Sequence, residues 1–172
     1  SSTIRRIVEK DAGFEVSAVD LANNETIKVC CDKIIYAGNK HALKYIYPKD
    51  SHLFENNQYA PWVVVNIVLK KELVNRSFWQ NEIISNDKSL MGFVDSKAQY
   101  AVSNKRQILT VYYCYKPEER EMMSLIRERK NRFVNNTLDH LEAYFNRPLK
   151  RNIDKIFIKQ MGHAMPIPAV GY

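Results

Sequence analysis

His163 is the histidine of this chain whose surroundings best suggest chemistry. It lies in the stretch Gly162-His163-Ala164-Met165-Pro166, directly after an apolar segment that predicts a strand. Irregular segments that follow strands often carry functional residues. A histidine in an ordinary surface loop fits the same sequence equally well.

Several kinds of catalytic site have no support. No two of the four histidines have the i, i+4 spacing of metal ligands, and the three cysteines form no metal-binding or redox motif. No serine lies in a nucleophile-elbow setting. Neither GxGxxG nor GxxxxGK occurs, so the chain lacks a glycine-rich loop for a phosphate. We therefore expect no metal site and no phosphate cradle.

Aromatic residues in strand-like stretches are the candidates for a ligand cavity. They are Trp62, Trp79, Tyr112 and Tyr113. Aromatic side chains on strands are more often plain core, so a structural role is the leading alternative for all four.

Charge is unevenly distributed along the 172 residues. The net charge is +7, and residues 61–172 account for it with 18 basic against 11 acidic side chains. The signs alternate in PEEREMMSLIRERKNR, which favours a solvated helix face over a surface for a polyanion such as nucleic acid. The longest apolar run is too short to span a bilayer. No signal peptide is visible, so we expect a cytoplasmic protein.

The first part of the chain reads as short strands. Segments 3–9, 14–21, 26–30 and 33–37 are apolar or alternating, and turn signals separate the first three. Gly38 then permits a bend. A short helix over 39–46 would begin with Asn39 as its cap.

The second part predicts a sheet with two helices. Strands are expected over 59–71, 78–85, 89–96, 106–116 and 152–161, and helices over 117–130 and 132–147. The run at 59–71 is apolar nearly throughout, which is typical of a strand covered on both faces. The last segment, 162–172, holds two prolines and two glycines, so we expect no regular structure there. The fold class is α+β: an antiparallel β-meander followed by a mixed sheet with helices packed on one side.

The order of these elements resembles the interior of FAD-dependent oxidoreductases of the flavin-containing amine oxidase and phytoene desaturase superfamily. In that family a three-stranded meander ends in a strand of the pattern aDkVIyA, which returns the chain to the FAD-binding domain. The matching residues are Cys31-Asp32-Lys33-Ile34-Ile35-Tyr36-Ala37. The following strands and helix pair match the family's substrate domain, and KQMGHAMPIPAVGY is similar to the stretch that leads back to the flavin.

This resemblance implies a domain division. Residues 1–46 would belong to the FAD-binding domain and 47–161 to the substrate domain, and 162–172 would return toward the FAD domain. It also implies cofactor contacts from Ile4, Ala37, Gly38 and Gly162, with His163 near the flavin as a candidate catalytic residue.

The implied function is hydride transfer from a substrate C–N or C–C bond to FAD. Trp62, Asn66 and Tyr113 are the expected substrate-binding residues. Many amine oxidases carry a lysine on the first long substrate-domain strand, but the matching stretch here is Val63-Val64-Val65-Asn66, which weakens the assignment to amines.

The resemblance further implies that the chain is the middle portion of a longer flavoprotein. The expected partners are a small-molecule substrate and the missing FAD-binding domain, and the portion alone should be inactive and should not hold FAD. Its exposed domain surface could also make it self-associate. The alternative is a non-catalytic module whose basic second part binds a polyanion or a protein.

Overall fold

The computed structural model describes residues 1–54, 56–73, 78–99 and 106–168. The chain forms two compact units, one within residues 1–58 and the other over 59–167. This division into compact units falls after residue 58, and the boundary expected after residue 46, between an FAD-binding and a substrate domain, stays a prediction.

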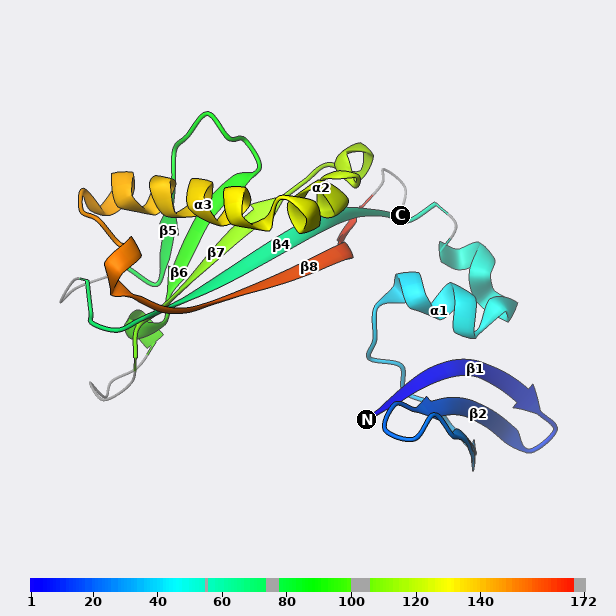
Figure 1. Ribbon diagram of the computed structural model, residues 1–172. Coiled ribbons are helices and arrows are strands. Elements are labelled where there is room, and N and C mark those ends of the chain that lie inside the picture. The colour runs from blue at the N-terminus through cyan, green and yellow to red at the C-terminus, as the bar shows by residue number, and fades with distance from the viewer. Residues whose placement is uncertain (55, 74–77, 100–105, 169–172) are drawn as a thin grey trace. The chain divides into compact units, whose positions relative to one another are not determined.

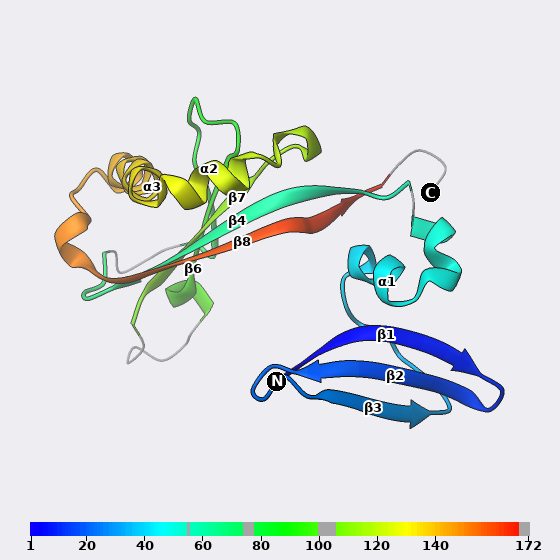
Figure 2. The same ribbon diagram turned by 45° about the vertical axis from the view of Figure 1, so that its right-hand side comes forward.

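The first unit contains a three-stranded antiparallel sheet, which confirms the predicted meander (Figure 2). Its strands, in the order β1-β2-β3, are β1 (Ser2–Lys10), β2 (Gly13–Asp20) and β3 (Thr26–Cys31). The register of β1 against β2 shifts between Ile4 and Arg6, so the edge strand bulges at this point.

Two short helices follow in the same unit. They are α1 (Lys40–Ile46) and the 3₁₀ helix η1 (Pro48–Phe54). The side chain of Asn39 accepts a hydrogen bond of 2.8 Å from the backbone N–H of His41, as expected for an N-cap.

The strand predicted over 33–37 does not form. These residues have no regular secondary structure, although their side chains alternate as in a strand. Ile34 and Tyr36 line a pocket with Leu43 of α1, while Ile35 is 96% exposed. An extended segment becomes a strand only when a neighbour accepts and donates its ladder hydrogen bonds, and the described sheet of this unit ends at β3.

The second unit contains a five-stranded sheet in the order β5-β6-β7-β4-β8 (Figure 1). Its strands are β4 (Gln58–Leu69), β5 (Gln80–Glu82), β6 (Leu90–Asp95), β7 (Ile108–Cys114) and β8 (Ile153–Ile167). β4 pairs with β7, β7 with β6 and β6 with β5, each time antiparallel. The α+β class is confirmed, and the sheet expected to be mixed is antiparallel.

Helices cover one face of this sheet (Figure 1). They are η3 (Pro117–Glu119), α2 (Met122–Glu128) and α3 (Lys130–Phe145), with the short 3₁₀ helices η2 (Ser96–Gln99) and η4 (Lys150–Asn152) in the connections. The apolar side of α3 packs on the sheet through Phe133, Leu138, Leu141 and Phe145. A solvated helix face was predicted for residues 117–132, and the charged side chains of that stretch are exposed apart from Arg120, which is half-buried.

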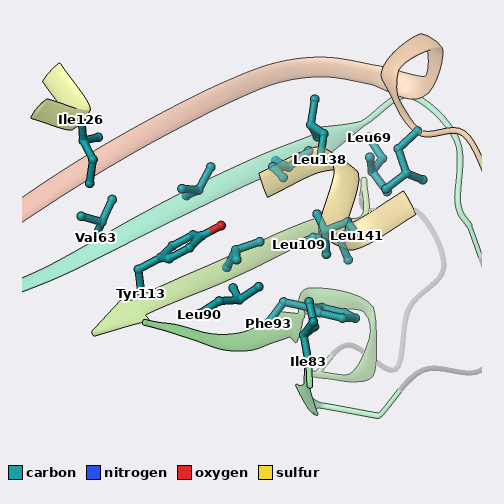
Figure 3. Close-up of a cluster of buried hydrophobic side chains, with 14 of the residues drawn as sticks. Val63, Leu69, Ile83, Leu90, Phe93, Leu109, Tyr113, Ile126, Leu138 and Leu141 are labelled. Carbon is teal, nitrogen blue, oxygen red and sulfur yellow. The ribbon is translucent and has the colours of Figure 1, made fainter. Parts of the chain in front are cut away.

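The core lies between these helices and the sheet (Figure 3). Alternate residues of β4 enter it: Val63, Val65, Ile67 and Leu69 are at most 1% exposed. The residues between them are only half-buried. β4 is thus fully covered on one face, whereas its apolar sequence indicated cover on both.

Residues 162–167 are regular structure, against expectation, because β8 continues through them to Ile167. β8 is an edge strand of the sheet. Pro166 lacks an N–H, but an edge strand has one side that pairs with no strand, so the ladder tolerates it there. Residues 169–172 of the expected return segment lie outside the described residues.

Candidate substrate-binding face

The face of the second sheet opposite the helices is the candidate site. Side chains alternate along a strand, so the residues of β4 and β7 that do not enter the core lie on this face. Across the strand pair they match as Trp62 with Cys114, Val64 with Tyr112, Asn66 with Thr110 and Val68 with Ile108. The helices α2 and α3 pack on the other face (Figure 1). An apolar sheet face without such cover is a surface that a ligand or another protein segment can occupy.

A pocket of about 310 Å³ lies on this face. Trp62 and Tyr112 form one wall, and their rings meet edge to face with centroids 5.8 Å apart. Trp79, Met91 and Val94 complete most of its apolar lining. The volume is at the lower end of the range for small-molecule sites, so it suits a small ligand or one end of a longer one.

The indole nitrogen of Trp62 is an unsatisfied polar group in this wall. Its Nε1 is buried and finds no hydrogen-bond acceptor among the described residues. A buried donor without an acceptor costs free energy, so this position is not optimised for the stability of this chain alone.

Asn66 provides a polar group in the middle of the face. Its Oδ1 accepts a hydrogen bond of 2.8 Å from the Thr110 hydroxyl on the neighbouring strand. In this orientation of the amide, its two N–H donors are available to a ligand.

Tyr113 does not join this face. It is 1% exposed, and its hydroxyl lies 2.9 Å from the Thr137 hydroxyl on α3. It lies in the core cluster with Val63 and Leu90 (Figure 3). Burial raises the pKa of Tyr113 well above its usual range, and the bond to Thr137 opposes this only in part. The expectation that Tyr113 binds substrate therefore gives way to a structural role.

Gly162 and His163 lie on β8, within the same unit as Trp62. The carbonyl of Gly162 accepts a hydrogen bond from the Arg120 guanidinium, which also donates to the Tyr59 carbonyl at 2.9 Å. The His163 ring meets the Tyr59 ring edge to face at 6.0 Å. Arg120 thereby ties the start of β4 to β8 and fixes the backbone around His163.

The other expected cofactor residues belong to the first unit. Ile4 is 42% exposed on β1, next to the bulge, and Ala37 and Gly38 are exposed in the connection before α1. A Cβ at Gly38 would lie 2.7 Å from the Tyr36 ring. A larger residue at position 38 would therefore require the Tyr36 side chain to move, and the backbone of Gly38 is not left-handed.

Sequence reasoning found the aromatic residues of the pocket but not its remaining members. Trp62, Trp79 and Tyr112 come together as a ligand cavity requires, while Met91 and Gly92 were missed. Gly92 has φ +131°, and a Cβ there would lie 2.1 Å from the Asn81 carbonyl oxygen. A glycine inside the strand-like stretch SLMGFVDS was the available signal, because such glycines mark bulges and close approaches.

In the described part of the chain, no three His, Cys, Asp or Glu side chains lie together as metal ligands would. None of the described helices combines the length and the apolar character needed to cross a bilayer.

No protein-family model and no curated protein matches the sequence. In structure the chain is similar to an oxidoreductase from Methanosarcina mazei, with a TM-score of 0.56 and 13% sequence identity. The similarity covers 94% of this chain but only 37% of the oxidoreductase chain. At this identity the likeness shows a shared fold, which includes residues of both units.

Proposed function

We propose that this chain is the substrate-binding portion, with part of the FAD-binding domain, of an FAD-dependent oxidoreductase. The intact enzyme would oxidise a substrate C–N or C–C bond, as expected for the amine oxidase and phytoene desaturase superfamily. The substrate would lose a hydride to the flavin and a proton to a base or to water, and a double bond would form between the two atoms.

The observation that carries this proposal is the similarity of fold to a much longer oxidoreductase. It includes nearly all of this chain, so it matches the order of both units and not one common motif. The open, apolar sheet face supports the same function, because hydride transfer requires a site that excludes water.

The residues present fit part of the surroundings of FAD. Exposed backbone at Ile4, Ala37 and Gly38 can meet the cofactor, and the backbone at Gly162 is fixed by Arg120. Nothing in the sequence offers a glycine-rich cradle for the pyrophosphate. The pyrophosphate would therefore be held by other residues, and the bound flavin would supply the hydride acceptor.

The residues of this chain would bind and orient the substrate. Trp62 and Tyr112 would hold its apolar part and keep water away, and the Asn66 amide would donate a hydrogen bond to an acceptor on it. His163, beside Tyr59, would make a polar contact near the flavin.

The absorption spectrum of the longer protein that contains this chain would test the proposal. We expect that protein to purify with one FAD per chain and the visible bands of a flavin, and we expect the 172-residue chain alone to be colourless. A longer protein that neither carries nor binds FAD would contradict the proposed function. Stoichiometric FAD on the 172-residue chain would contradict its assignment as a portion that lacks the phosphate site.

A further inference from the structure

The pocket beside Trp62 has an uncharged lining. Its residues are Trp62, Trp79, Gln80, Asn81, Met91, Gly92, Phe93, Val94 and Tyr112. All of them are apolar or carry a neutral amide, hydroxyl or indole N–H. Glu82 pairs with Gly92 across β5 and β6, but it is exposed and does not line the pocket.

The polar groups of this lining are already partly engaged. The Nδ2 of Asn81 donates to the Phe78 carbonyl at 2.9 Å, and its Oδ1 accepts from the Tyr144 hydroxyl at 3.0 Å. Gln80 is thus the lining amide whose side chain makes no hydrogen bond within the described part of the chain. A charged ligand would lose water in this pocket and would meet no ion of opposite sign among the lining residues.

Aromatic rings attract a cation. This attraction opposes the free energy that the cation loses when it leaves water. A cation over an aromatic face gains modest energy, whereas an ion that is removed from water without a counter-ion loses considerably more. The Trp62 and Tyr112 rings also meet edge to face, so one ring face is already covered by its neighbour. Desolvation therefore outweighs the attraction of the rings for a cation.

We infer that this pocket binds an uncharged apolar group and discriminates against a protonated amine. Trp79 and Met91 are 54% and 50% exposed, so such a group can reach the pocket from solvent. The inference rests on the proposed function where it concerns the substrate: an enzyme with this pocket would oxidise a neutral substrate at a C–C bond rather than an amine at a C–N bond.

Three matched probes test the inference on the 172-residue chain. They are 1-naphthylmethanol, 1-naphthylmethylamine and 1-naphthoate, which are neutral, cationic and anionic at pH 7 with the same ring system. The chain contains two tryptophans, and both line the pocket, so the two indole N–H signals of a ¹H–¹⁵N spectrum report on it directly. We expect the alcohol to shift these signals and to bind at least about tenfold more tightly than either ion.

A charge placed in the lining should reverse this preference. Met91→Glu adds a carboxylate at a half-exposed position, so the amine should gain about tenfold or more and should then bind more tightly than the alcohol. Ile84→Glu adds the same charge at a residue that is 97% exposed and outside the lining, and it should leave the preference of the wild type unchanged.

The outcomes separate this inference from the proposed function. Equal or tighter binding of the amine to the wild-type chain would overturn it, as would an alcohol that shifts neither indole signal. An equal effect of Ile84→Glu would show that general surface charge, not the pocket lining, sets the preference, and would overturn it as well. None of these results depends on FAD, whereas the proposed function fails only if the longer protein does not bind the flavin.

Discussion

Tyr112 and Tyr113 are neighbours in sequence, but they lie on opposite faces of the same sheet. Tyr113 is 1% exposed in the core and shares a hydrogen bond with Thr137 of α3. Tyr112 lies on the open face, where its ring packs against Trp62 at the edge of a pocket. The residue type is the same, so the difference comes only from the alternation of side chains along β7.

This comparison assigns different tasks to the two faces. The helix-covered face contains the fully buried side chains, and we expect it to determine stability. The open face is half-buried, contains an indole N–H without an acceptor among the described residues, and is the proposed ligand surface. Substitutions of matched residues on the two faces test this division.

The largest difference is expected between Leu109→Ala and Ile108→Ala. Leu109 is fully buried under the helices, so its truncation should lower the free energy of unfolding by about 2–5 kcal/mol. Ile108 is half-buried on the open face, so Ile108→Ala should lower the free energy of unfolding by less than about half as much. Urea unfolding followed by tryptophan fluorescence measures this, since both tryptophans belong to the second unit. Equal losses would show that both faces are packed alike.

A comparable effect is expected from Gly92→Ala. A Cβ at this left-handed position would collide with the Asn81 carbonyl, so we expect a loss of about 1–3 kcal/mol. Gly162→Ala is the matched control, because its Cβ would meet only the Arg120 guanidinium at 3.6 Å and should change stability by less than about 0.5 kcal/mol. Thermal unfolding followed by circular dichroism compares the two, and an unchanged transition in Gly92→Ala would contradict the described backbone.

Alkaline pH should destabilise the covered face. Burial raises the pKa of Tyr115 to about 12 and that of Tyr113 still further, while both phenols titrate near 10 in the unfolded chain. The neutral phenol favours the folded state, so this stability is complete below pH 10 and is lost as the pH rises. Between pH 10 and 11 the loss should be about 1 kcal/mol per phenol.

Urea unfolding at these two pH values measures that loss. The double variant Tyr113→Phe/Tyr115→Phe should show a shallower decline, whereas Tyr112→Phe should follow the wild type. A decline as steep in the double variant as in the wild type would show that other groups cause it.

The smallest effect is expected at the hydroxyl groups of the paired tyrosines. Tyr113→Phe removes the hydrogen bond to Thr137, which still donates to the Phe133 carbonyl, so it should cost about 0.5–1.5 kcal/mol at neutral pH. Tyr112→Phe keeps the ring contact with Trp62 and should be close to neutral. If the two variants lose the same stability, the assignment of the two faces is wrong.

Local patterns predicted most of the elements but not the two faces. The cap Asn39, the proline at the start of η3 and the apolar spacing of α3 each act through contacts within a few residues, so they could be read directly. The run Trp62–Leu69 and the aromatic residues of β7 have no clear alternation between apolar and polar positions. Nothing in these stretches distinguished Tyr112 from Tyr113, and Tyr113, which was expected to bind substrate, lies in the core.

The sequence by itself determined the α+β class, the order of the elements and the apolar, aromatic character of the candidate site. The tertiary structure decided which aromatic residues face the pocket, that Gly162 to Ile167 continue β8, and that residues 33–37 form no strand. The physical reason is the same in each case. A strand exists, and one of its faces becomes buried, only through hydrogen bonds and packing with residues distant in sequence.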